Sequence, residues 1–90
     1  MKTFDSLDFQ QHPNWPDGIR AKLEFPNGYT ASVIQFPYSY GGTNGLYELA
    51  IINADNELDY TTPITDDVLG DLSKDDVTQL LQRIADLPKA

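Results

Sequence analysis

The chain has 90 residues, no cysteine, and six basic against fourteen acidic side chains, which gives a formal net charge of −8. This length predicts one domain over residues 1–90, and the lack of cysteine excludes disulfides and a cysteine nucleophile. The excess of acid disfavours direct contact with nucleic acids or with anionic membranes, because both need clustered basic side chains. No apolar run is long enough to span a bilayer, and no secretory signal is visible, so we expect a cytoplasmic protein.

The first segment, residues 1–18, is predicted to be an irregular lead-in with room for a short strand. Its second part, residues 12–18, holds two prolines and an Asp-Gly pair, which are typical of loops. Apolar and charged residues then alternate over 19–25, which indicates a strand with one face in water. The Asn27-Gly28 pair predicts a tight hairpin turn, because both residue types adopt positive φ angles at low cost.

After this turn the sequence contains three further candidate strands, over residues 29–36, 46–53 and 58–61. The first is rich in β-branched and aromatic residues and ends before a proline, and the second is mostly apolar. A glycine-rich stretch, residues 41–45, connects these two and is predicted to be a hairpin loop. Sequential strands with short connections favour an antiparallel meander of three to four strands over residues 19–61.

The last third of the sequence, residues 65–87, changes to helical spacing. Thr65 can cap a short helical turn that Gly70 closes, and Ser73 can cap a second helix. The apolar residues that follow define one stripe, formed by Val77, Leu80, Leu81, Ile84 and Leu87. This stripe needs an apolar partner, and the sheet is the only one of sufficient size. The sequence therefore predicts an α+β fold, with the C-terminal helix packed on one face of the sheet.

Residues that carry catalysis are scarce in this sequence. His12 is the only histidine, and none of the serines lies in the Gly-x-Ser-x-Gly context of a hydrolase nucleophile. The acidic segment that starts at Asp66 does not follow the ligand spacing of a calcium loop, and helix capping accounts for Asp66, Asp75 and Asp76. The 41–45 stretch lacks the lysine of a phosphate-binding loop. We predict no catalytic residue, no metal site and no bound cofactor.

Side chains suited to binding a protein are more frequent. Residues 1–45 hold four acidic and three basic side chains, whereas residues 46–90 hold ten and three, so the second half carries most of the net charge. Such a half attracts basic surfaces, and exposed tyrosine and tryptophan anchor many interfaces. Phe36 and Tyr47 are assigned to the core. The candidate partner-binding residues are Trp15, Tyr38, Tyr40, Asp66, Asp67, Asp71, Asp75 and Asp76.

Three segments of the chain have distinctive turn and strand motifs. They read Asn27-Gly28-Tyr29-x-x-Ser32-Val33-Ile34, Tyr40-Gly41-Gly42-x-x-Gly45-Leu46-Tyr47-Glu48-Leu49-Ala50 and Thr62-Pro63-Ile64-Thr65-Asp66-Asp67-Val68-Leu69-Gly70-x-Leu72-Ser73. On these segments, within about residues 27–82, the chain resembles small acidic proteins encoded by phages and prophages. The resemblance implies an origin in a phage or mobile element and action in a bacterial cytoplasm. Those proteins are of unassigned function, so it implies no activity and no catalytic residue.

Three functional hypotheses follow. The leading one is a non-enzymatic protein-binding module that inhibits a host protein with a basic surface, for which the acidic half would act as a nucleic-acid mimic. The alternative is a small homo-oligomeric component of a phage, in which a sheet edge or the tyrosine-bearing loop pairs with a second copy. The third, ranked last, is a cation-dependent enzyme that uses Asp66, Asp67 and Asp71. A competing interpretation of the acidic half is that it only keeps the protein soluble.

Overall fold

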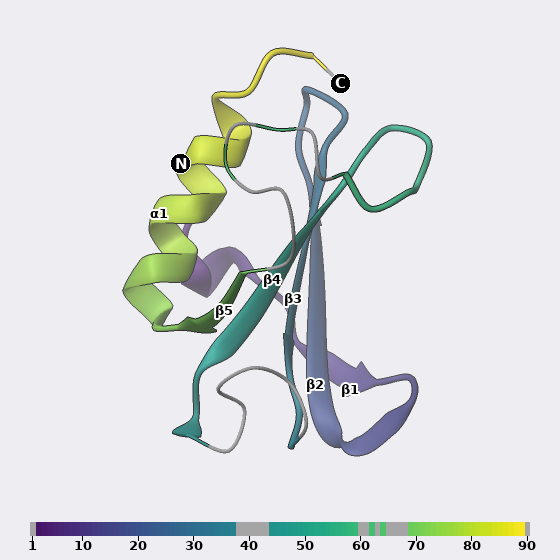
Figure 1. The fold of residues 1–90 in the computed structure, drawn as a ribbon, viewed down its shortest axis with the longest axis vertical. Helices are drawn as coiled ribbons and strands as arrows, with labels where there is room; N and C mark the ends of the chain where they lie inside the picture. The colour runs from purple at the N-terminus through teal and green to yellow at the C-terminus, as the bar shows by residue number, and fades with distance from the viewer. Residues whose placement is uncertain (1, 38–43, 60–61, 63, 65–68, 90) are drawn as a thin grey trace.

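The computed structural model describes residues 2–37, 44–59, 62, 64 and 69–89. Over these residues the chain forms one sheet with a helix on one side of it (Figure 1). The elements are, in chain order, η1 (Phe4–Ser6), β1 (Gln10–His12), β2 (Trp15–Glu24), β3 (Thr30–Gln35), β4 (Tyr47–Ile52), β5 (Leu69–Leu72) and α1 (Lys74–Ala85). All neighbouring strands are antiparallel and the order is β1-β2-β3-β4-β5. The predicted α+β class, the meander and the C-terminal helix are confirmed.

The number of strands is five, so the prediction of three to four was wrong. The additional pairing comes from β5, which lies inside the 65–87 region that we assigned to helices. Leu69 and Leu72 pair with β4 and pack against the core, and this satisfies backbone groups of β4 that would otherwise lie at a sheet edge. Leu69 and Leu72 are three residues apart, a spacing that fits a helical turn, and both face the core from a strand only because the β4–β5 ladder is irregular and Asp71 has a φ of 55°. Most of the predicted helical turn falls on residues 65–68, which lie outside the described residues.

Two strand boundaries also differ from the sequence prediction. β2 begins at Trp15, so residues 15–18 belong to a strand and not to the predicted loop. The turn is reduced to Pro13-Asn14, because His12 already pairs with Trp15 across an irregular stretch of the β1–β2 ladder. Leu58, expected at the start of a strand over 58–61, forms an isolated bridge with Ile52, and residues 60 and 61 lie outside the described part of the chain.

The turn between β2 and β3 is the predicted Asn27-Gly28 hairpin. Gly28 has a φ of 96°, and its N–H donates to the carbonyl of Phe25 at 3.0 Å. The Asn27 side chain accepts the N–H of Tyr29 at 3.1 Å and donates through Nδ2 to the carbonyls of Ile84 and Leu87, at 2.8 and 3.2 Å. One amide group therefore closes the hairpin and also caps the end of α1, joining two parts of the chain 57 residues apart.

The core lies between α1 and one face of the sheet, as Figure 1 shows for the helix along one side of the strands. The predicted helical stripe is confirmed: four of its residues are buried, and Leu87 packs against them. The sheet contributes alternate residues of each strand, chiefly Val33, Leu49 and Ile51. Tyr47 is buried as predicted, and its ring lies 4.9 Å from that of Phe4.

The N-terminus of α1 carries the predicted cap. Ser73 Oγ accepts the N–H of Asp76 at 3.1 Å, and Asp76 Oδ2 accepts the N–H of Ser73 at 3.0 Å. Asp75 lies beside it in the first turn, where a carboxylate is favoured by the helix dipole. The same helix holds the start of the chain, because the N–H of Phe4 donates to Thr78 Oγ1 at 2.9 Å.

We predict that Asn27→Ala lowers the free energy of unfolding by about 2 kcal/mol, because each lost hydrogen bond contributes about 1 kcal/mol and part-buried carbonyls lose their donor. Urea unfolding followed by circular dichroism measures this. Asn14→Ala is the control, since Asn14 is exposed in a turn and its truncation should cost less than about 0.5 kcal/mol. Equal losses in the two variants would contradict the bridging role of Asn27.

Candidate functional site: the open face of the sheet

The second face of the sheet is covered by neither α1 nor η1, because both lie on the core side. Strand residues alternate between faces, so the residues between the core positions point to this second side. We call it the open face. Its residues are Gln10, Arg20, Lys22, Glu24, Thr30, Ser32, Ile34, Glu48, Ala50, Ile52 and Leu58.

The ladder arranges the open face in three cross-strand rows. The first row is Gln10, Arg20, Ile34 and Glu48, the second is Lys22, Ser32 and Ala50, and the third is Glu24, Thr30, Ile52 and Leu58. The second row has small side chains on β3 and β4, between larger ones in the rows on either side. The face is therefore hollowed at its centre.

The hollow has a volume of about 310 Å³. Its lining residues are His12 and Asn14 from the β1–β2 hairpin, Arg20 and Glu48 on opposite sides, Ser32, Ile34 and Ala50 on the floor, and Leu58 at the far end. It thus combines an apolar floor with one positive and one negative side chain. Such a surface suits contact with another protein, where a central apolar area is framed by polar groups.

An aromatic group lies at one end of the open face. The rings of Trp15 and Phe36 stack at 5.2 Å with an interplanar angle of 21°, and His12 lies 5.3 Å from Phe36. Phe36 was assigned to the core, which was wrong: it continues the alternation of Ser32 and Ile34 and packs beside the open face. His12 Nδ1 accepts the N–H of Asn14 at 3.1 Å, so this nitrogen is occupied in the hairpin turn.

Gly18 makes this aromatic packing possible. A Cβ at this position would lie 2.7 Å from the Cβ of Phe36 and 3.1 Å from that of His12. Both distances are shorter than ordinary van der Waals contact, so a side chain here would force the rings apart. The Asp17-Gly18 pair, which the sequence analysis interpreted as a loop signal, is a close-packing position within a strand.

Leu58 is the most exposed large apolar residue in the described chain at 50%, and Trp15 follows at 36%. Leu58 reaches the open face because a turn returns the chain along β4: Asn53 Oδ1 accepts the N–H groups of Asp55 and Glu57, each at 3.0 Å. The N–H of Asp59 then donates to Ile51 at 2.8 Å. The turn therefore holds this exposed leucine at the edge of the open face.

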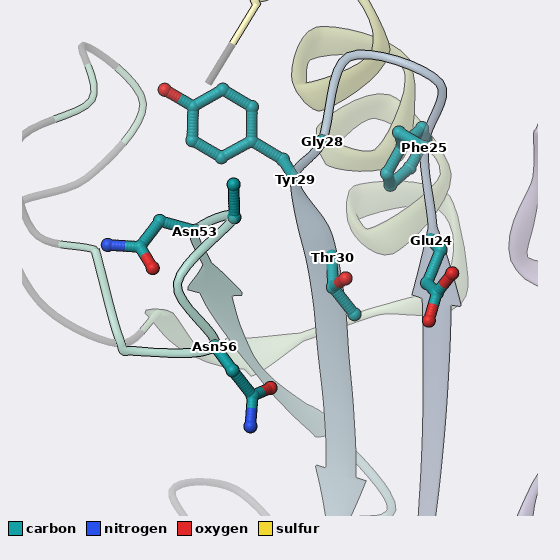
Figure 2. A pocket seen from close by; sticks show the side chains of 8 residues that line it. Glu24, Phe25, Gly28, Tyr29, Thr30, Asn53 and Asn56 are labelled. Carbon is teal, nitrogen blue, oxygen red and sulfur yellow. The ribbon is translucent and has the colours of Figure 1, made fainter.

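A second hollow, of about 320 Å³, lies where the open face meets the turns at its end. Figure 2 shows the turn that carries Asn53 and Asn56 beside the strand ends that carry Thr30 and Glu24. The amide oxygen of Asn53 is occupied by the turn itself, and Glu24 is the only charged residue of the lining. This hollow offers neither a cluster of charges nor an apolar floor, so it is a weaker candidate site.

The structure separates the predicted binding residues. Trp15 lies beside the β1 edge of the sheet, and Asp71 lies in β5 at the opposite edge. Asp75 lines a shallow hollow with Phe4, whereas Asp76 lines a groove on the other side of α1 with Arg83. Four of the predicted residues lie outside the described part of the chain: Tyr38, Tyr40, Asp66 and Asp67.

The acidic side chains do not converge within the described residues. Asp55 and Glu57 lie on the turn after β4, at the upper right of Figure 1, whereas the N-terminus of α1 with Asp75 and Asp76 lies at the lower left. No three histidine, aspartate or glutamate side chains in these ranges are placed to hold a metal ion. Asp76 has a structural task as the helix cap, in agreement with the capping interpretation.

The open face itself is balanced in charge. It carries Arg20 and Lys22 against Glu24 and Glu48, so the net charge of −8 resides elsewhere on the molecule. The guanidinium of the half-buried Arg20 makes no ion pair or hydrogen bond with another described residue. The open face therefore differs from the rest of this acidic protein in having balanced charge, a hollow and, among the described residues, an arginine without a charged partner.

The chain has no match among protein-family models, curated proteins or solved structures. In the described residues, no helix has the length and apolar character needed to cross a bilayer.

We predict that Gly18→Ala displaces Phe36 and lowers the free energy of unfolding by about 1–3 kcal/mol, because the added methyl group overpacks the site. It should also shift the fluorescence of Trp15, the only tryptophan. Gly45→Ala is the comparison: Gly45 has open space around it but a φ of +74°, so alanine costs about 1 kcal/mol of strain there and leaves the emission unchanged. Identical emission from both variants would contradict the close packing at Gly18.

Proposed function

We propose that this chain is a non-enzymatic protein-binding module that holds its partner against the open face of the sheet. The observation that carries the proposal is that Leu58 lines a hollow of balanced charge and that Trp15 stacks on Phe36 beside the open face. Among the described residues, these two are the large apolar side chains that are exposed. Tryptophan is among the residue types that supply most of the binding energy of protein interfaces, and an exposed leucine adds apolar contact area beside it. The charges of Arg20 and Glu48 would fix the orientation of the partner.

Two classes of partner are compatible with this module. A foreign partner would be basic, because the negative charge around the face speeds association with positively charged proteins such as those that bind nucleic acids. A second copy is the other class, which corresponds to a homo-oligomeric component of a phage. The balanced charge of the open face favours the second copy, because a face with equal numbers of positive and negative side chains has no net attraction to a basic surface but can pair opposite charges with an identical face.

The setting of this activity is also part of the proposal. The resemblance of residues 27–82 to small acidic phage proteins supports an origin in a phage or mobile element. The same resemblance supports action in the cytoplasm of a bacterial host.

Replacing Leu58 by aspartate tests the role of the open face, because the exposed side chain is not needed for folding. We immobilise the chain and add a bacterial lysate that contains a tagged second copy, so that both partner classes are sampled. Leu58→Asp should reduce retention of the partner by about tenfold, which corresponds to about 1.4 kcal/mol of binding free energy. A basic foreign partner would in addition be released at high salt.

The matched control is Gln79→Asp, which adds the same charge to an exposed position of α1 on the other side of the molecule. It should retain the partner as well as the unaltered chain does. Equal retention by Leu58→Asp and Gln79→Asp, for every retained protein, would refute binding through the open face.

A further inference from the structure

We infer that the open face binds a second copy of this chain, so that two sheets stack face to face around a two-fold axis parallel to β3. This inference rests on the proposed function and names the partner. It is carried by the row that contains Arg20, Ile34 and Glu48, in which β2 supplies the positive charge and β4 the negative one at the same level of the sheet.

The geometry of stacked sheets explains why this row is decisive. A two-fold axis along β3 places β2 of each copy opposite β4 of the other and keeps each row level with itself. Arg20 then faces Glu48 of the second copy, and the symmetry repeats this pair on the other side of the axis. Ile34 meets Ile34 of the second copy at the centre, where an apolar contact belongs.

The neighbouring rows accept the same arrangement. Lys22 faces Ala50 of the second copy, Glu24 faces the position of Ile52, which is already buried within its own chain, and the small Ser32 lies on the axis opposite itself. No two like charges of the face oppose each other. An axis across the strands through the middle row would place Lys22 against Lys22, which like-charge repulsion disfavours. That axis would also pair Arg20 with Glu24 of the second copy, but of the two arrangements only the axis along β3 opposes no like charges. It keeps the strands of the two sheets aligned, as is usual for sheet sandwiches.

The unpaired state of Arg20 within the described residues supports the same conclusion. Its side chain is half-buried, and removing an arginine from water is costly unless a carboxylate receives it. A carboxylate such as that of Glu48 has two oxygens with several acceptor positions, so it can accept this arginine in addition to a contact within its own chain. The pair would form twice in each dimer.

The size of the face sets the strength of the dimer. Four strands about 4.8 Å apart and about six residues long give an area of roughly 20 by 20 Å per copy. This is below the roughly 800 Å² that each partner buries in a standard stable interface, so we expect a weak dimer that forms at tens to hundreds of micromolar. The net charge of −8 on each copy acts against association, which adds to this expectation.

The test is a charge exchange between two variants, Arg20→Glu and Glu48→Arg. Light scattering and sedimentation over a series from about 10 μM to 1 mM should show a dimer for the unaltered chain, and at least a tenfold weaker one for each variant alone. When the two variants are mixed in equal amounts, both contacts between the copies again join opposite charges, one as the native pair of Arg20 with Glu48 and the other with reversed sign, so a mixed dimer should return. Thermal unfolding of each variant verifies that it is folded.

Mixing separates contacts between copies from contacts within one chain. Recovery in the doubly exchanged chain, Arg20→Glu with Glu48→Arg, without recovery in the mixture would place the pair within one chain and overturn the inference. If the unaltered chain is monomeric at every concentration, the inference of a dimer is also overturned. In that case, retention of a foreign protein that Leu58→Asp abolishes would leave the proposed function standing, whereas no dependence on Leu58 would refute both.

Discussion

One constraint determines most of this molecule: a single amphipathic helix can cover only one face of a sheet. The stripe of α1 is matched by the alternate residues Val33, Leu49 and Ile51, and burial of each such side chain contributes about 1.5–3 kcal/mol. Every position between these residues must then point away from the helix. The core and the open face are therefore two results of the same alternation, and the surface we propose for binding exists because the chain supplies no second helix in its described part.

The elements that sequence patterns predicted are those whose signal is local. Alternation over 19–25, the Asn27-Gly28 turn and the capped apolar stripe of α1 each depend on side chains a few residues apart, and each is present. β5 and the position of Phe36 depend on contacts with distant parts of the chain. Leu69 and Leu72 become a strand because β4 has an edge to pair, and Phe36 leaves the core because the sheet alternation places it on the other side.

The candidate site shows the same division. The sequence indicated one water-facing side of the 19–25 strand and selected Trp15, which the structure places at the border of the open face. It did not indicate Leu58, Ile34 or Glu48, because joining them requires the register of three strands and of the turn after β4. The count of acidic residues, in contrast, predicted a concentrated surface, and the described aspartates are distributed over separate sides of α1 and over a distant turn. Net charge is a property of composition, whereas a patch is a property of the fold.

The amide that joins the hairpin to α1 has a chemical consequence of its own. An asparagine followed by glycine is prone to deamidation, because glycine has no side chain to hinder attack of the next backbone nitrogen on the side-chain amide carbon. The attack expels ammonia and forms a cyclic imide, which water then opens to a carboxylate. In the folded chain, both ends of the Asn27 amide are engaged in hydrogen bonds, and the N–H of Gly28 is bonded to Phe25. Loss of the amide would replace its donor by a carboxylate directed at two carbonyl oxygens, at the negative end of a helix. Deamidation of Asn27 is therefore expected to be slower in the folded chain than in the unfolded chain. A chain that deamidates while unfolded would refold to a less stable structure.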